Sequence, residues 1–178
     1  MENGIRRFTK TIIDVIVILI LALFISRYVG GPFKITGHSM EPTLSAKDRV
    51  LVDRISNNIR SIKRFELILF TIDEKDSTQY VKRVIGLPGE TVQIKDGLVY
   101  INDKKIDMGK LDKVLQPGLA KHPITLGKDE YFVLGDNSTG SEDSRYLNIG
   151  NISKKQIKGI VWLRFYPFSK IGKITGIQ

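Results

Sequence analysis

Cysteine is absent from the sequence, and histidine occurs only twice, at His38 and His122. Without cysteine the chain cannot form disulfides or thiolate zinc sites. The two histidines and the scattered acidic residues have no spacing typical of metal ligands, so no metal or other cofactor is expected. Aromatic-plus-basic motifs, C₂H₂ patterns and basic-zipper patterns are missing as well, and nucleic acid is therefore not expected as a partner.

Positive charge is in excess, with 28 lysine and arginine residues against 19 acidic ones and a formal net charge of +9. Such a surface permits binding to anionic lipid, to a polyanionic wall polymer or to nucleic acid. The basic residues are spread along the whole chain, however, and a solvated basic surface is the simpler interpretation. A length of 178 residues with 42% hydrophobic side chains suffices for one folded domain with its own core.

One long apolar run lies near the N-terminus, from Ile12 to Ile25, and only Asp14 interrupts it. Continued to Val29, the run approaches the roughly 20 residues of a membrane-spanning helix. Gly30-Gly31-Pro32 then ends the helix, because proline cannot continue the hydrogen-bond ladder. The sequence predicts a single transmembrane anchor over residues 11–29.

A cleaved signal peptide is the alternative, because the apolar core Val15–Ile25 also has the length of a signal-peptide h-region. The proline directly after Val29-Gly30-Gly31 and the nearby Arg27 favour an uncleaved anchor. Basic residues ahead of the run predict a cytoplasmic N-terminus over residues 1–10 and an extracytoplasmic domain over residues 33–178. These basic residues are Arg6, Arg7 and Lys10.

Beyond Pro32 the pattern changes to short β-rich runs separated by Gly, Pro and Asp. We expect strands at 49–55, 66–72, 79–85, 91–94, 98–101, 130–134 and 160–166. Asp96-Gly97, between two of these runs, predicts a hairpin with a type I′ turn, which needs positive φ at both central positions. Together these features predict a mainly β domain with an antiparallel sheet and, at about 103–128, a loop or small insertion.

Ser39, in a loop-like stretch that leads to Pro42, is the first candidate catalytic residue. A serine needs a neighbouring base to become a nucleophile at neutral pH. His38 is adjacent in sequence, and such neighbours seldom point at one another, while His122 lies in the weakly patterned insertion. The alternative is that Ser39 only caps a turn.

Lys82 is the better candidate for the base. Alternation along the strand predicted at 79–85 places Tyr80, Lys82 and Val84 on one face. Burial between an aromatic residue and a valine lowers the pKa of a lysine, and its neutral amine can then accept the serine proton. The alternative is a snorkelling lysine whose ammonium reaches water.

A third polar cluster, Gly135 to Arg145, follows the strand predicted at 130–134. Its side chains favour hydrogen bonds to their own backbone, which indicates a rigid turn. Asp143 and Arg145 can pair across this turn, and Ser141 can donate or accept one hydrogen bond toward a buried amine.

Four segments, in this order, resemble the boxes of bacterial type I signal peptidases, and the short insertion and single predicted anchor resemble the Gram-positive form. The segments are Ser39–Leu44, Asp48–Val50, Tyr80–Glu90 and Gly135–Arg145, within a resemblance over about residues 10–168. The resemblance implies a membrane-anchored serine endopeptidase with a mostly β catalytic core. It would remove signal peptides from translocated secretory preproteins, at sites with small residues in the first and third positions before the cut.

The same resemblance implies a role for each candidate residue. Ser39 would be the nucleophile and Lys82 the general base. Ser141 would orient the lysine amine, Asp143 and Arg145 would support that loop, and Met40 would pack beside the catalytic groups.

Two positions depart from the family pattern. Gly37 stands where some relatives supply a second oxyanion donor from a serine, and Ser138 follows Gly-Asp-Asn where many members carry arginine. Three other functions stay open: a catalytically silent paralogue that binds signal peptides or secretion machinery, a basic membrane-surface or nucleic-acid module, and a self-cleaving repressor with Ser-Lys chemistry. Such repressors are soluble, and the apolar run at Ile12–Ile25 argues against that reading.

Overall fold

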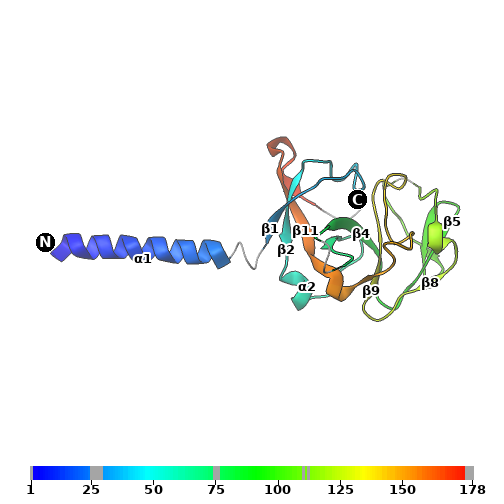
Figure 1. Ribbon diagram of the computed structural model, residues 1–178, viewed down its shortest axis with the longest axis horizontal. Coiled ribbons are helices and arrows are strands. Elements are labelled where there is room, and N and C mark those ends of the chain that lie inside the picture. The colour runs from blue at the N-terminus through cyan, green and yellow to red at the C-terminus, as the bar shows by residue number, and fades with distance from the viewer. Residues whose placement is uncertain (1, 25–29, 74–76, 110, 112, 175–178) are drawn as a thin grey trace.

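The described chain contains two antiparallel sheets, and a long helix precedes them (Figure 1). The computed structural model describes residues 2–24, 30–73, 77–109, 111 and 113–174. The helices and strands, in chain order, are α1 (Glu2–Phe24), β1 (Gly31–Lys34), β2 (Arg49–Asp53), α2 (Ser56–Ile59), β3 (Leu67–Phe70), β4 (Tyr80–Gly86), β5 (Thr91–Lys95), β6 (Leu98–Ile101), β7 (Lys104–Lys105), β8 (Ile124–Thr125), β9 (Glu130–Leu134), β10 (Ile152–Ser153), β11 (Ile157–Tyr166) and β12 (Gly172–Lys173). Single 3₁₀ turns are η2 (Gly118–Lys121), η3 (Lys154–Gln156) and η4 (Phe168–Lys170).

The large sheet has eight strands in the order β1-β2-β11-β3-β4-β9-β10, with β12 paired to β11. Its neighbouring strands are antiparallel, which confirms the predicted mainly β, antiparallel class. Both faces of the sheet are covered, because Leu67 and Leu69 of β3 join one buried cluster and Ile68 and Phe70 join another. This explains why β3 is apolar at successive positions instead of alternating.

The second sheet has four strands in the order β7-β6-β5-β8. Its β5–β6 hairpin is the predicted one, and φ is 51° at Asp96 and 77° at Gly97, as a type I′ turn requires. β7, η2 and β8 all fall within the stretch 103–128. The small sheet shares a buried cluster with Phe132 and Leu134 of β9, and so packs against the large sheet.

Strand β4 is paired unequally on its two sides. β3 pairs with Tyr80 to Arg83, whereas β9 pairs with the later residues Arg83, Val84 and Gly86. Among the strands that the structure describes, the edge of Tyr80–Lys82 that faces away from β3 has no strand partner. This edge borders the candidate site described below.

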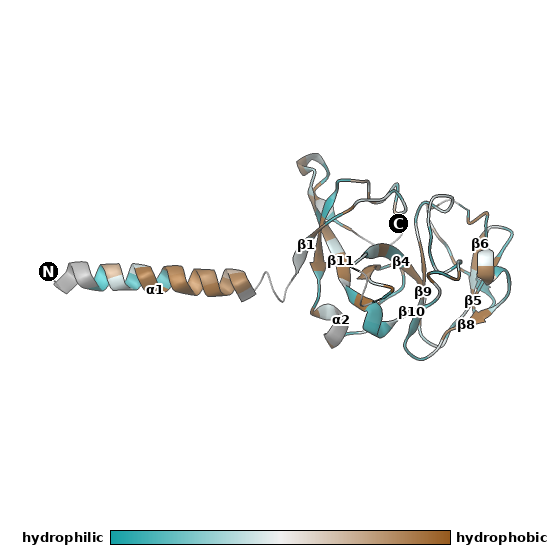
Figure 2. Cartoon of the chain, in the orientation of Figure 1, coloured by the Kyte–Doolittle hydropathy of each residue, from teal (hydrophilic) through white to brown (hydrophobic). Residues whose placement is uncertain are grey.

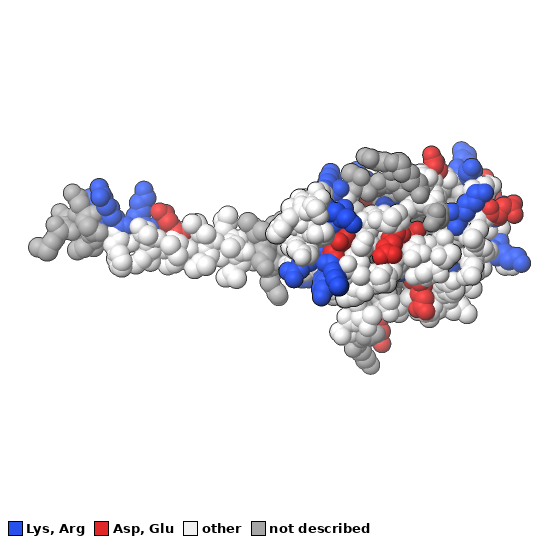
Figure 3. Space-filling model, turned by 90° about the horizontal axis from the view of Figure 1, so that it is seen from above, with Lys and Arg blue, Asp and Glu red and all other residues white. Residues whose placement is uncertain are grey.

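All side chains of α1 from Arg6 to Leu23 are exposed. From Arg6 on, α1 first mixes polar and apolar residues and then becomes apolar (Figure 2). Arg6, Arg7 and Lys10 lie toward its N-terminal end, and both charge signs are scattered over the visible face of the domain (Figure 3). Within the described residues, no helix has both the length and the apolar composition needed to cross a membrane. The predicted anchor, 11–29, includes residues 25–29, which lie outside the described part of the chain.

Candidate active site

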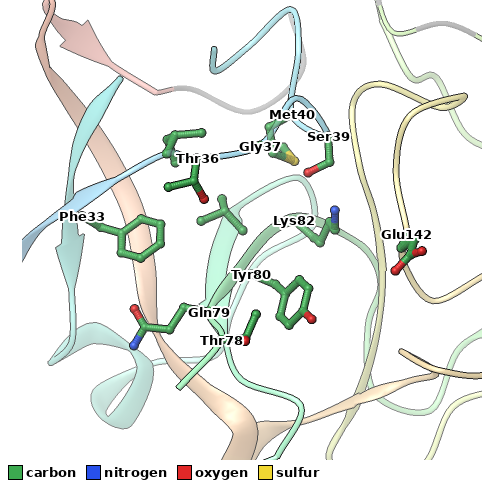
Figure 4. Close-up of a pocket in the computed structure, with 12 residues that line it drawn as sticks. Phe33, Thr36, Gly37, Ser39, Met40, Thr78, Gln79, Tyr80, Lys82 and Glu142 are labelled. Carbon is green, nitrogen blue, oxygen red and sulfur yellow. The ribbon is translucent and has the colours of Figure 1, made fainter. Parts of the chain in front are cut away.

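Ser39 and Lys82 line the same pocket, which has a volume of about 250 Å³. Ser39 lies in the loop between β1 and β2, and Lys82 lies on β4. The serine hydroxyl and the lysine amine point toward one another across the pocket (Figure 4). The described residues that line it are Phe33, Ile35, Thr36, Gly37, Ser39, Met40, Thr78, Gln79, Tyr80, Val81, Lys82 and Glu142.

The Ser39 loop is held by the turn that follows β9. The backbone N–H of Asn137 donates to the Ser39 carbonyl oxygen at 3.0 Å, and its side-chain amide donates to the His38 carbonyl oxygen at 3.2 Å. Gly135 must lack a side chain, because a Cβ there would collide with the Ser141 side chain and the Ser39 carbonyl oxygen. With its carbonyl fixed on this side, Ser39 presents its hydroxyl to the pocket, and the next side chain, Met40, is fully buried.

Lys82 is buried, with an exposed fraction of only 3%. The register of β3 and β4 pairs Lys82 with Ile68 and Tyr80 with Phe70, so the predicted face is apolar around the amine. Burial disfavours the ammonium and lowers the pKa of Lys82 to about 8; the carboxylate of Asp143 opposes this shift, and the guanidinium of Arg145 adds to it. The snorkelling alternative is wrong, because the amine lies inside the protein.

The turn from Gly135 to Arg145 is locked by a buried ion pair. Arg145 donates to both carboxylate oxygens of Asp143, at 2.7 and 2.9 Å. The guanidinium also donates to the carbonyl oxygens of Gln116, Ser138 and Ser141. Asp143 in turn accepts a hydrogen bond from the Gly135 N–H at 3.0 Å. The predicted pairing across the turn is confirmed, and it fixes the backbone that carries Ser141.

Ser141 itself is buried, and its hydroxyl has no hydrogen-bond partner among the described residues. A buried hydroxyl without a partner is costly and calls for an explanation. Ser138, which departs from the family pattern, does have a hydrogen-bond partner: its hydroxyl donates to the Lys113 carbonyl oxygen at 3.0 Å. That bond ties the turn to the loop beside the small sheet, so a serine at this position still stabilises the turn.

The family described as "Signal peptidase, peptidase S26" matches residues 8–166. The chain belongs to this family. A signal peptidase I of Bacillus amyloliquefaciens is 37% identical over 167 residues, which cover 89% of this chain and 88% of that protein.

A second Bacillus relative and a crystal structure are also similar to this signal peptidase family member. Signal peptidase I U of Bacillus subtilis (strain 168) is 38% identical over 176 residues, with 93% of this chain and 92% of that protein covered. A crystal structure of a signal peptidase I from Enterococcus faecalis V583 has 30% identity and a TM-score of 0.46, over 57% of this chain and 97% of that chain. The resemblance predicted from the four segments is confirmed, and the protein is an enzyme of the peptidase class.

Sequence reasoning missed a second buried ion pair of the peptidase. Arg83, next to Lys82, donates to both oxygens of Asp136 at 2.7 and 2.6 Å, and both side chains are about 2% exposed. Arg83 also donates to the Phe65 carbonyl oxygen and to the Thr43 hydroxyl. The pair therefore joins β4, the turn after β9 and the segment that follows Ser39. The only signal in the sequence was an arginine beside the candidate base.

Neither histidine is placed to act as the base of a Ser-His-Asp triad with Ser39. The side chain of His38 is exposed, and its Nδ1 lies 2.9 Å from the Glu41 carboxylate. His122 is exposed and follows η2, beside the small sheet. No group of three or more metal-binding side chains occurs in the described part of the chain. A lysine remains the candidate base.

Proposed function

We propose that this peptidase removes signal peptides from secretory preproteins, with Ser39 as nucleophile and Lys82 as general base. The observation that carries the proposal is a serine hydroxyl directed at a buried lysine amine, both on one pocket. An amine with a pKa near 8 is partly neutral at physiological pH and can accept a proton, which an ordinary lysine does only at higher pH. The family match supports the substrate class.

In the proposed mechanism the neutral amine of Lys82 takes the hydroxyl proton as the Ser39 oxygen attacks the scissile carbonyl. The resulting ammonium returns a proton to the departing amine, which leaves an acyl ester on Ser39. Water, deprotonated by the same lysine, then hydrolyses this ester. The backbone N–H of Ser39 is the proposed oxyanion donor, and Gly37 adds no side-chain donor.

The pocket suits an extended substrate with small side chains. The edge of Tyr80–Lys82 that no described strand pairs is placed to hydrogen-bond a substrate backbone as an added strand. Apolar side chains form the wall beside that edge, from Phe33 and Ile35 on one segment and Tyr80 and Val81 on the other. Such a wall accepts alanine-like side chains before the cut without leaving polar groups unpaired.

We also propose that the N-terminal segment, residues 11–29, anchors the peptidase in the membrane in a single pass, with residues 1–10 in the cytoplasm and the catalytic domain outside. The apolar side chains of α1 are exposed along the helix. Lipid is a partner that would cover such side chains, and the basic residues at the N-terminal end fit a cytoplasmic location. Protease accessibility of the domain in intact spheroplasts tests the orientation, and digestion only after lysis would contradict it.

Ser141 is proposed to position the amine of Lys82. Ser141→Ala should lower cleavage by up to about 100-fold, as misplacement of a reacting group predicts, and change the pH profile of kcat/KM. The variant should be as stable as the wild type or slightly more stable, because it removes a buried hydroxyl without a partner. Thermal unfolding and cleavage rates measured on the same preparations check both points. Full activity with an unchanged profile would contradict the positioning role.

The decisive experiment is cleavage of a preprotein with an Ala-X-Ala site by the full-length protein in detergent, beside Ser39→Ala. We expect a cut after the second alanine by the wild type and none by the variant. A folded wild-type protein that binds this preprotein without cutting it would favour the silent paralogue. Loss of cleavage in Ser39→Ala without loss of binding would show that the serine is needed for the reaction and not for substrate binding.

A further inference from the structure

Glu142 is the one acidic residue among the described side chains that line the candidate pocket. It follows Ser141 in the locked turn, and its side chain is exposed. The Asn148 side-chain amide donates to its carboxylate at 3.2 Å, and within the described residues it forms no ion pair. The pocket therefore carries a solvent-accessible negative charge on the turn, and this charge forms no salt bridge within the described residues.

The carboxylate and the apolar wall lie on different sides of Ser39 and Lys82. In Figure 4 Phe33, Thr36 and Gln79 lie on one side of the two groups, and Glu142 lies on the other. The proposed substrate places its small residues before the cut on the apolar side. The chain after the cut then leaves Ser39 toward Glu142.

We infer that Glu142 recognises a basic side chain, lysine or arginine, in the first two residues after the scissile bond. This inference rests on the proposed function and adds a charge preference on the departing side of the substrate. An accessible ion pair of this kind is weak, because water and salt screen it. The expected preference for a basic over a neutral residue is therefore modest, at most about fivefold in kcat/KM, and it should fall at high salt.

Glu142 also acts on the pKa of Lys82, because its negative charge favours the ammonium. That effect would change the rate for all substrates together. The ratio of kcat/KM between two substrates at one pH cancels it, and so isolates recognition from any effect on the base. The ion pair would form as soon as the substrate binds, before the reaction begins. Its loss should therefore raise KM and leave kcat nearly unchanged.

The test uses full-length protein in neutral detergent and peptides with alanine at the first and third positions before the cut. The peptides differ only in carrying Lys, Gln or Glu at the first or the second position after it. The wild type should cleave the lysine peptide best and the glutamate peptide worst in at least one of the two series. Glu142→Gln should bring the three rates together, and Glu142→Lys should reverse their order. Asp103→Asn is the matched control, because it removes one exposed negative charge at a turn position with φ of 61°, which asparagine tolerates.

Each outcome has a separate meaning. Charge ratios that are the same in the wild type and in Glu142→Gln would overturn the inference and leave the proposed function intact. The same holds if Asp103→Asn changes the ratios as much as Glu142→Gln does. Failure of the wild type to cleave even the glutamine peptides would count against the proposed function, and the inference would fall with it.

Discussion

Lys82→Met is expected to abolish cleavage, with a loss of about 10⁴-fold or more, in the range seen when a catalytic nucleophile or base is removed. The methionine side chain is unbranched and apolar, so it suits the buried site between β3 and the turn after β9. The variant should therefore fold. Lys104→Met is the matched control, because this lysine lies on the exposed strand β7 of the small sheet, and its replacement should leave the rate unchanged.

The pH dependence of the wild type should report the same amine. The proposed base must be neutral to accept a proton, and the pKa of Lys82 is lowered to about 8. Below that value kcat/KM should fall about tenfold for each pH unit, and above it the rate should level off. A profile measured from about pH 6 to about pH 10 checks this. A rate that is flat across this range would contradict Lys82 as the base.

The stability of Lys82→Met gives an independent check. The pKa of Lys82 is lower in the folded chain than the usual 10.5, so the unfolded chain binds more protons between these values and wild-type stability rises with pH. Near neutral pH the buried amine costs the wild type up to about 3 kcal/mol, which the methionine variant avoids. The advantage of the variant should shrink as pH rises and vanish above the usual lysine pKa. A variant that is less stable than the wild type at pH 7 would show that the amine is not desolvated.

The strand of Lys82 and its neighbours could be predicted because they follow local rules. Alternation predicted the face shared by Tyr80, Lys82 and Val84, and the register with β3 confirms it. Asp96-Gly97 predicted its hairpin because the turn conformation depends on those two residues alone. In the same way the pairing of Asp143 with Arg145 spans only two positions, and the structure contains it.

The partners that are distant in sequence could not be predicted. Arg83 and Asp136 are 53 positions apart, and nothing in either segment indicates the other. Their contact depends on the pairing of β4 with β9, which a single sequence does not reveal. The same applies to Asn137, whose N–H holds the carbonyl oxygen of Ser39. The sequence thus shows which side chains are present, but the order of the strands in the sheet decides which of them come into contact.

Asp136→Ala is the second change with a large expected effect. It leaves the guanidinium of Arg83 buried without a counter-charge, which typically costs about 3–5 kcal/mol. Arg60→Ala is the matched control, because Arg60 and Glu66 form a similar two-bond pair that is 38% and 23% exposed, and its loss should cost at most about 1 kcal/mol. Chemical unfolding in detergent, followed by the fluorescence of Trp162, measures both.

A loss of stability alone does not show that the Arg83–Asp136 pair positions Ser39 and Lys82. A double variant separates the effect on stability from the effect on cleavage. Arg83→Met with Asp136→Leu replaces the buried charges by apolar groups, which is often neutral or favourable for stability. Arg83 joins the strand of Lys82 to the turn whose Asn137 holds the Ser39 carbonyl oxygen, and to Thr43 beyond the serine. If this connection sets the approach of the hydroxyl to the amine, the double variant should regain most of its stability and still cleave about 10- to 100-fold more slowly, as misplacement of reacting groups predicts. Recovery of both stability and rate would mean that the pair only holds the sheet and turn together, and that the geometry of Ser39 and Lys82 is set by the backbone alone.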